Sequence, residues 1–188
     1  ADTSGINSFD LTGATDQVLT LDAGYTGATS VTIKGDVTNS DTVSNNANVA
    51  LTVTANMKDL DGTLTGGTGT DTLNVTMDGA TQTVLSTFTN FETINVTSSA
   101  TAGTNGGLTM NNANVAATKS MTVNASTLAS NEVFTFSAAA ELSGSYTVTG
   151  GAAADSLTGG SGIDTITGGA GNDTIDGGAG NDTLNGGL

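Results

Sequence analysis

The chain has 188 residues, with 18 Asp and Glu against 3 Lys and Arg, which gives a formal net charge of −15 at pH 7. It contains no Cys and no His, so disulfides, thiolate chemistry, Cys-based zinc sites and a histidine general base are excluded. The acidic balance makes nucleic acid and anionic membrane surfaces poor partners and divalent cations good ones. No apolar run approaches the length of a membrane span, so we expect no membrane insertion.

Short alternations of an apolar residue with Thr recur from residue 18 to residue 149. A period of two is typical of half-buried strands, and Gly, Asn, Asp and Ser supply the turns between them. The segments read VLTL, SVTI, ALTVT, GTLT, TLNVTM, ETINVT, GLTM, SMTV, VFTF and YTVT. We therefore expect residues 1–149 to form an irregular, Thr- and Ala-rich succession of short strands.

One segment in this part of the chain favours a helix. In TQTVLSTFTNFE, residues 81–92, the apolar side chains of Val84, Leu85, Phe88 and Phe91 fall at helical spacing. The spacing predicts a short helix here.

The end of the chain repeats a nine-residue unit, G-G-x-G-x-D-x-U-x, in which U is apolar. An isolated copy, GGTGTDTLN, occupies residues 66–74. A stretch with so little apolar mass cannot bury a core of its own, so another force must hold it folded. The consecutive copies are Gly150–Thr158, Gly159–Thr167, Gly168–Asp176 and Gly177–Asn185, with Leu157, Ile166, Ile175 and Leu184 as the apolar residues.

These repeats decide between a sandwich, a barrel and a solenoid. Each repeat has room for one short strand and one turn, so two repeats make a full winding and no hairpin forms. We predict an all-β, parallel β-solenoid in which each winding touches only its neighbours. An irregular β-helix over residues 1–149, with the isolated repeat at 66–74, leads into a regular β-roll over residues 150–188.

The composition of the repeat favours calcium as the stabilising ligand. Its glycines permit a tight turn with inward-pointing carbonyls, and its Asp adds a carboxylate at the same place. Calcium takes about six to eight oxygen ligands in tolerant geometry, whereas magnesium demands a stricter octahedron. Because turns on one side of the coil are two repeats apart, Asp155 is expected to face Asp173, and Asp164 to face Asp182, each pair sharing one ion.

The repeats resemble the RTX calcium-binding repeat family, whose nonapeptides form parallel β-rolls. Upstream, FTNFETINVT at residues 88–97 and the Thr- and Ala-rich segments resemble RTX-type surface-layer proteins of Gram-negative bacteria. The resemblance implies calcium as cofactor, type I secretion and an extracellular, cell-surface location. The implied metal-binding residues are Asp155, Asp164, Asp173, Asp182 and Asp71, with Gly160, Gly162, Gly169, Gly171, Gly178, Gly180, Asn172 and Asn181 in the turns.

Some acidic positions depart from the repeat pattern. Ala153 replaces the fourth glycine and disfavours positive φ, so we expect a distorted turn and a weaker site at Asp155. No nonapeptide lies two repeats from Asp71, which leaves both a calcium site and a plain surface turn open there. Asp22, Asp36, Asp41, Asp59 and Asp61 are further candidate oxygen ligands, but we favour surface turns for each, with Asp36, Asp41, Asp59 and Asp61 able to share ions between molecules. We expect Glu92, Glu132 and Glu141 to be exposed, and they lie far apart in the sequence.

The sequence contains no catalytic motif and no histidine for a triad, so we expect that the chain is not an enzyme. The favoured interpretation is a structural cell-surface protein, a calcium-stabilised solenoid that assembles with copies of itself into a layer or filament, with cell-surface polysaccharide as a further partner. The alternatives are an adhesin or ice- or polysaccharide-binding module, and the export and folding region of a secreted hydrolase. Both ends of the sequence read as cuts, which indicates a fragment.

Overall fold

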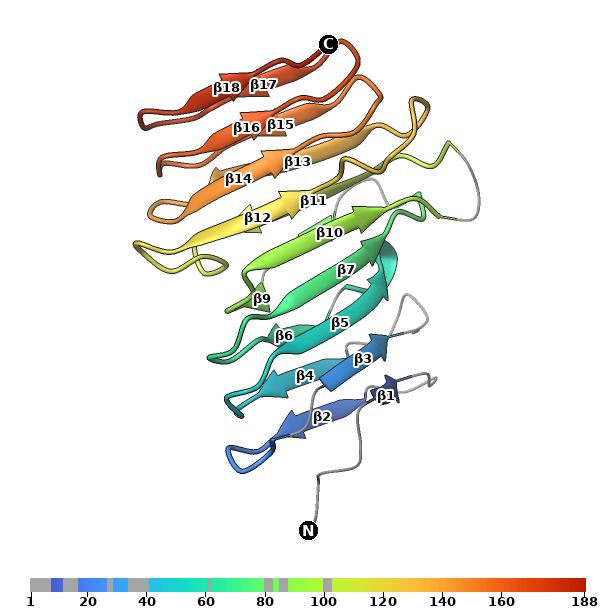
Figure 1. The fold of residues 1–188 in the computed structure, drawn as a ribbon, viewed down its shortest axis with the longest axis vertical. Helices are drawn as coiled ribbons and strands as arrows, with labels where there is room; N and C mark the ends of the chain where they lie inside the picture. Colours follow the sequence, from blue (N-terminus) through green and yellow to red (C-terminus); the bar gives the residue numbers. More distant parts are fainter. Residues whose placement is uncertain are drawn as a thin grey trace.

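The computed structural model describes residues 8–11, 17–26, 29–33, 41–60, 62–79, 83–84, 88–99 and 103–188. Short strands stack in successive windings along one long axis, with Ser8–Leu11 near one end and Thr183–Asn185 at the other (Figure 1). Every strand pair among the described residues is parallel. The predicted all-β, parallel β-solenoid is confirmed.

The described residues form eighteen strands and one short 3-10 helix. No helix in this part of the chain has the length and apolarity needed to cross a membrane. The elements in chain order are β1 Ser8–Leu11, β2 Val18–Leu21, β3 Thr29–Ile33, β4 Thr42–Asn45, β5 Leu51–Asn56, η1 Met57–Asp59, β6 Thr63–Thr65, β7 Thr72–Thr76, β8 Thr83–Val84, β9 Phe88–Thr89, β10 Thr93–Thr97, β11 Gly106–Asn111, β12 Ser120–Asn124, β13 Phe134–Ala140, β14 Ser145–Thr149, β15 Ser156–Thr158, β16 Thr165–Thr167, β17 Thr174–Asp176 and β18 Thr183–Asn185.

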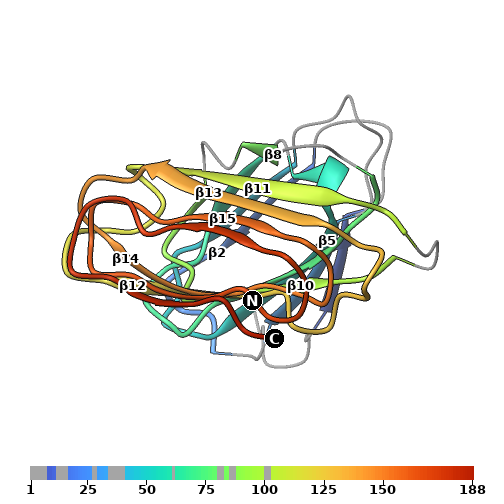
Figure 2. The ribbon, with the colours of Figure 1, turned by 90° about the horizontal axis from the view of Figure 1, so that it is seen from above.

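The strands line two facing walls, which are seen end-on in Figure 2. One wall is a nine-stranded sheet in the order β1-β3-β5-β7-β10-β12-β14-β16-β18. The opposite wall consists of a four-stranded sheet, β2-β4-β6-β9, and a five-stranded sheet, β17-β15-β13-β11-β8. The chain crosses from wall to wall through a corner at each end of the flattened winding, so residues at equivalent corners of successive windings stack on one another.

The alternation of apolar residues with Thr and Asn produces these walls because side chains of a strand point alternately to its two faces. In β5 and β7 the apolar positions are buried and the intervening Thr and Asn positions are half-buried. Each fully buried aliphatic side chain contributes roughly 1.5–3 kcal/mol to the free energy of unfolding. One register column of the nine-stranded wall contains seven consecutive residues that are each 0% exposed, namely Val31, Val53, Leu73, Ile94, Val123, Val148 and Ile166.

This core thins towards the C-terminal end of the described stack. Phe134, Phe136 and Tyr146 still fill the windings before the repeats, and Phe136 meets Tyr146 edge-on with ring centroids 5.4 Å apart. In the last windings Ile175 is only partly buried, and Leu184 is 49% exposed. Apolar burial therefore holds the irregular part together but contributes little to the final repeats.

The helix predicted over residues 81–92 is wrong in the described part of that segment, which holds the strands β8 and β9. Phe88 is the register partner of Leu64 and stacks on Phe91 with ring centroids 4.6 Å apart. Pairing with the neighbouring winding supplies backbone hydrogen bonds and burial together, and this outweighs the local helical spacing.

Candidate metal centre

The nonapeptide turns stack in pairs at the two corners of the coil. Thr174 is the register partner of Ser156, and Thr183 is the partner of Thr165, so two repeats make one winding as predicted. Asp173 consequently lies over the Asp155 turn, and Asp182 lies over the Asp164 turn at the opposite corner.

The aspartates of each pair meet through a carboxylate and a backbone amide. The Oδ1 of Asp173 accepts the N–H of Asp155, and the Oδ1 of Asp182 accepts the N–H of Asp164, both at 2.9 Å. The predicted pairing of these residues is therefore confirmed as a stacking relationship. Each carboxylate thus accepts the backbone N–H of the residue that directly precedes a strand of the preceding winding.

The same contact, in which a carboxylate oxygen accepts a backbone N–H of the preceding winding, recurs along the chain and also links the repeats to the windings before them. An acidic residue directly before a strand accepts the N–H of its register partner in the preceding winding, and an unpaired buried N–H would cost about 1–3 kcal/mol. Asp41 is accordingly buried and not in a surface turn, contrary to the sequence-based expectation. The other pairs are Asp41 with Gln17 (2.9 Å), Asp71 with Leu51 (2.6 Å), Glu92 with Asp71 (2.7 Å), Asp155 with Phe134 (2.8 Å) and Asp164 with Tyr146 (2.6 Å).

The second carboxylate oxygen separates two kinds of turn. The Oδ2 of Asp155 accepts the N–H of Gly151 at 2.6 Å, and the Oδ2 of Asp164 accepts that of Gly160 at 2.8 Å. The Oδ2 of Asp173, in contrast, is buried and has no hydrogen-bond partner. A buried carboxylate oxygen without a donor is unfavourable unless a cation approaches it, so this turn fits a metal ion.

A space beside the first glycine of the repeat gathers oxygen atoms. The Oδ2 of Asp173 and the carbonyl oxygen of Gly186 both lie closer than 3.0 Å to the point where a Cβ on Gly168 would sit. At Gly159 the corresponding atoms are the Oδ2 of Asp164 and a carbonyl oxygen of the next winding. Converging carboxylate and carbonyl oxygens are the hard ligands that calcium prefers, and a side chain in place of the glycine would fill this space.

These sites depend on backbone oxygens as much as on carboxylates. Within the described ranges no group of three acidic side chains converges on one point. Burial raises the pKa of Asp155, the amides of Phe134 and Gly151 lower it, and the neighbouring Asp173 raises it again. A divalent ion between the turns would reverse the net effect because it favours the charged carboxylate.

The structure places the predicted turn residues where the repeat pattern puts them. Gly169, Gly171, Gly178 and Gly180 have positive φ, between 84° and 135°, whereas Gly160 and Gly162 do not. Asn172 and Asn181 are exposed at the tips of their turns. The assignment of these residues and of the aspartates as calcium ligands stays a prediction.

The expected distortion by Ala153 is absent. Ala153 has no positive φ, and neither has Gly162 at the same position of the next repeat. The carboxylates of Asp155 and Asp164 also accept the same two kinds of hydrogen bond, one from a backbone N–H of the preceding winding and one from a backbone N–H of their own turn. Alanine is tolerated because this turn does not require the left-handed conformation.

Three further acidic residues are buried, contrary to expectation. Asp59 accepts a hydrogen bond from Asn56 at 2.8 Å and lies beside Lys58, so it is not available to share an ion with another molecule. Glu132 and Glu141 are 1% and 0% exposed. The Oε1 of Glu141 accepts the backbone N–H groups of the next three residues, at 3.0 to 3.2 Å, and thereby organises the turn before β14. Asp36 and Asp61 lie outside the described residues.

Sequence reasoning also missed the role of Glu92. Its carboxylate caps Asp71 in the way that the repeat aspartates cap one another. The available signal is the match between Glu-Thr-Ile at residues 92–94 and Asp-Thr-Leu at residues 71–73, in which an acidic residue precedes a strand that starts with Thr.

The family model for the RTX calcium-binding nonapeptide repeat matches four copies over residues 149–184. The comparisons with curated proteins and with solved structures gave no match. The match agrees with the two-repeat winding, the stacked aspartates and the oxygen-lined turns, and calcium is the ion that such repeats bind. Residues 149–184 of the chain are thus RTX calcium-binding nonapeptide repeats.

Proposed function

We propose that this calcium-binding solenoid is a structural protein of the cell surface that associates with copies of itself once calcium has ordered its repeats. The observation that carries the proposal is the outer face of the nine-stranded wall. From β3 to β18 its strands contain no charged residue, in a chain with a net charge of −15.

The outer face is a regular array of hydroxyl and amide groups. One register column runs through Thr52, Thr72, Thr93, Thr122, Thr147, Thr165 and Thr183, and a parallel column through Thr54, Asn74, Asn95, Asn124, Thr149, Thr167 and Asn185. Such a surface offers donors and acceptors at a fixed repeat without charge repulsion, which suits lateral packing against a second copy.

The acidic residues gather at the corners instead. Asp71, Asp164 and Asp182 directly precede strands of this wall, and Asp155 and Asp173 precede strands of the opposite wall. Where calcium is scarce, the repulsion among these carboxylates opposes both folding of the repeats and association. Extracellular modules bind calcium with dissociation constants of about 10⁻⁴–10⁻³ M, so the repeats would order after export by type I secretion.

Association is measured by light scattering and electron microscopy of the full chain across a millimolar calcium series. Ordered assemblies should form above a threshold and dissolve with chelator. The Thr147→Lys variant places a charge on the proposed contact wall and should remain monomeric, whereas Thr135→Lys, on the opposite wall, should assemble normally. A calcium-loaded wild type that stays monomeric at high concentration would contradict the proposal.

The same columns support a second candidate function, a module that binds a flat, repetitive target such as ice or a crystalline polysaccharide. The fixed spacing of Thr hydroxyls along the wall favours it. Retention of the calcium-loaded monomer on such a target, lost in Thr147→Lys and kept in Thr135→Lys, would support this function over self-assembly.

A further inference from the structure

The isolated repeat at residues 66–74 faces a turn that is not a nonapeptide. Thr72 is the register partner of Thr93, so Asp71 stacks beneath Glu92, 21 residues later in the chain. The Oε2 of Glu92 accepts the N–H of Asp71 at 2.7 Å. The turn of residues 90–92 thus supplies an acidic residue at the position that Asp173 and Asp182 occupy in the repeats, although its spacing hides it from a search for nonapeptides.

Asp71 carries a carboxylate oxygen with no donor. The residue is 0% exposed, and its Oδ1 accepts the N–H of Leu51 at 2.6 Å and the side-chain amide of Asn45 at 3.5 Å. Its Oδ2 is buried without a hydrogen-bond partner, like the Oδ2 of Asp173. The second glycine of the turn, Gly67, has a φ of +100°, and the second glycine of the Asp173 turn is likewise left-handed.

A backbone oxygen converges on the same space. The Oδ2 of Asp71 lies 2.7 Å from the point where a Cβ on Gly66 would sit, and the carbonyl oxygen of Asn90 is closer still. Asn90 reaches this position with a φ of 58°, a left-handed conformation that Asn tolerates better than most residues. Two oxygen acceptors therefore approach one another, and the buried carboxylate oxygen has no hydrogen-bond donor, as at Gly168.

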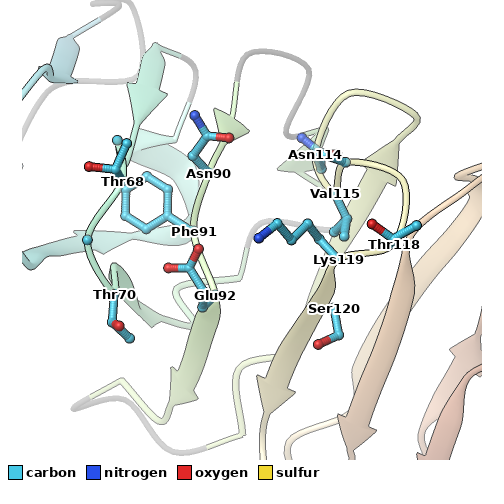
Figure 3. A pocket seen from close by; sticks show the side chains of 13 residues that line it. Thr68, Thr70, Asn90, Phe91, Glu92, Asn114, Val115, Thr118, Lys119 and Ser120 are labelled. Carbon is cyan, nitrogen blue, oxygen red and sulfur yellow. The ribbon is translucent and has the colours of Figure 1, made fainter. Parts of the chain in front are cut away.

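The corner is also open to solvent on one side. A pocket of about 620 Å³ is lined by residues 67–70, 90–92, 114–116 and 118–120. Figure 3 shows mainly polar side chains around it, with Lys119 extended towards the side that carries Phe91 and Glu92. Asn90 and Glu92 line this pocket, whereas Asp71 lies beneath them with no exposed surface. An ion held here would take water molecules from the pocket side as its remaining ligands.

We propose that Asp71, Glu92 and the carbonyl oxygen of Asn90 bind a calcium ion at this corner, outside the repeats that the family model matches. The ligand set is entirely oxygen, it carries two carboxylates, and its irregular geometry suits calcium better than magnesium. The ion fastens the β7 winding to the β10 winding. The proposal shares only its ion with the proposed function and does not depend on self-assembly.

The test is calcium titration of the full chain by calorimetry, together with an ion count by native mass spectrometry. Asp71→Asn and Glu92→Gln keep the shape of the side chain and should each remove one ion or weaken one site at least tenfold. Asp22→Asn, in an exposed turn, is the matched control and should change nothing. Lys119→Ala should strengthen the site, because a competing positive charge leaves the pocket.

Unchanged ion counts and affinities in both Asp71→Asn and Glu92→Gln would overturn the proposal. If Asp71→Asn does not fold, Glu92→Gln decides alone. Glu92 is exposed, and the Gln side chain keeps an oxygen that can accept the N–H of Asp71. Asp164→Asn distinguishes the Asp71 site from calcium binding by the repeats. If Asp164→Asn loses calcium while Asp71→Asn and Glu92→Gln do not, only the proposed Asp71 site is refuted. A wild type that binds no calcium would overturn both.

Discussion

The Oδ1 of Asp164 accepts the N–H of Tyr146, its register partner in the preceding winding, at 2.6 Å. The aspartate of an RTX repeat therefore has two functions in this chain. One oxygen caps the backbone of the neighbouring winding, and the other faces its own turn, where an ion would bind. The two functions can be separated by substitution.

Asp164→Ala removes both functions, whereas Asp164→Asn keeps an acceptor for the cap and loses the charge. With chelator present, Asp164→Ala should lower the free energy of unfolding by about 1–3 kcal/mol, because the buried N–H of Tyr146 loses its partner. Asp164→Asn should lose less stability than Asp164→Ala under the same conditions, because its amide oxygen keeps the bond to Tyr146 although its NH2 group faces the N–H of Gly160. Urea unfolding with and without calcium measures both effects, and equal losses for the two variants in chelator would contradict the capping role.

Chelation should loosen the end of the stack before the middle. Val53, Leu73 and Ile94 are fully buried, whereas Leu184 is 49% exposed, so the final repeats have little burial to oppose repulsion between their carboxylates. Hydrogen exchange of the full chain should show lost protection over residues 159–188 and retained protection in β5, β7 and β10. Uniform loss across all windings would show that apolar burial does not hold the irregular part on its own.

The space beside Gly168 can be tested by filling it. A Cβ on Gly168 would collide with the Oδ2 of Asp173 and the carbonyl oxygen of Gly186, so Gly168→Ala should abolish calcium binding at that corner. Gly24→Ala is the control, because Gly24 lies outside the repeats and a Cβ there meets nothing within 4 Å. Calorimetry of both variants checks the difference, and equal affinities would remove the oxygen-lined space from the site.

Without calcium the chain should be more stable in mild acid than at neutral pH. Burial raises the pKa of Asp71 to about 6, and the neighbouring Glu92 also raises it, although the amide of Leu51 opposes them. A folded-state pKa above the unfolded value of 3.8 means that the protonated group favours the folded state, and this advantage is lost as the pH rises through about 6. Burial also raises the pKa of Asp155, which acts in the same direction.

We therefore expect the free energy of unfolding in chelator to fall between pH 4 and pH 7 by roughly 2 kcal/mol for Asp71 alone. Asp71→Asn should remove that part of the slope and stabilise the calcium-free chain at pH 7. Denaturant titrations at several pH values provide the measurement. If the free energy of unfolding of the calcium-free chain instead rises from pH 4 to pH 7, burial does not disfavour the ionised form of these carboxylates in the folded state.

The nonapeptides determined the coil of residues 150–188 from sequence alone, because each turn is set by local residues and the period of the repeat fixes which turns stack. The pairing of Asp155 with Asp173 and of Asp164 with Asp182 follows from that period, and the structure has both. The alternation of Thr with apolar residues likewise determined most upstream strands, since the side-chain period of a strand does not depend on what it pairs with.

Only the tertiary structure decided which residues of neighbouring irregular windings are register partners. Their lengths vary, so no fixed spacing leads from Asp71 to Glu92, and the partner becomes visible only when Thr72 and Thr93 are in register. The same reason explains the missed burial of Asp41 and Glu141, whose carboxylates satisfy backbone amides that the neighbouring winding and turn bring to them. Phe88 joined a strand and not a helix for this reason too: its partner Leu64 lies one winding away, and burial against that winding is a long-range contribution that local spacing does not contain.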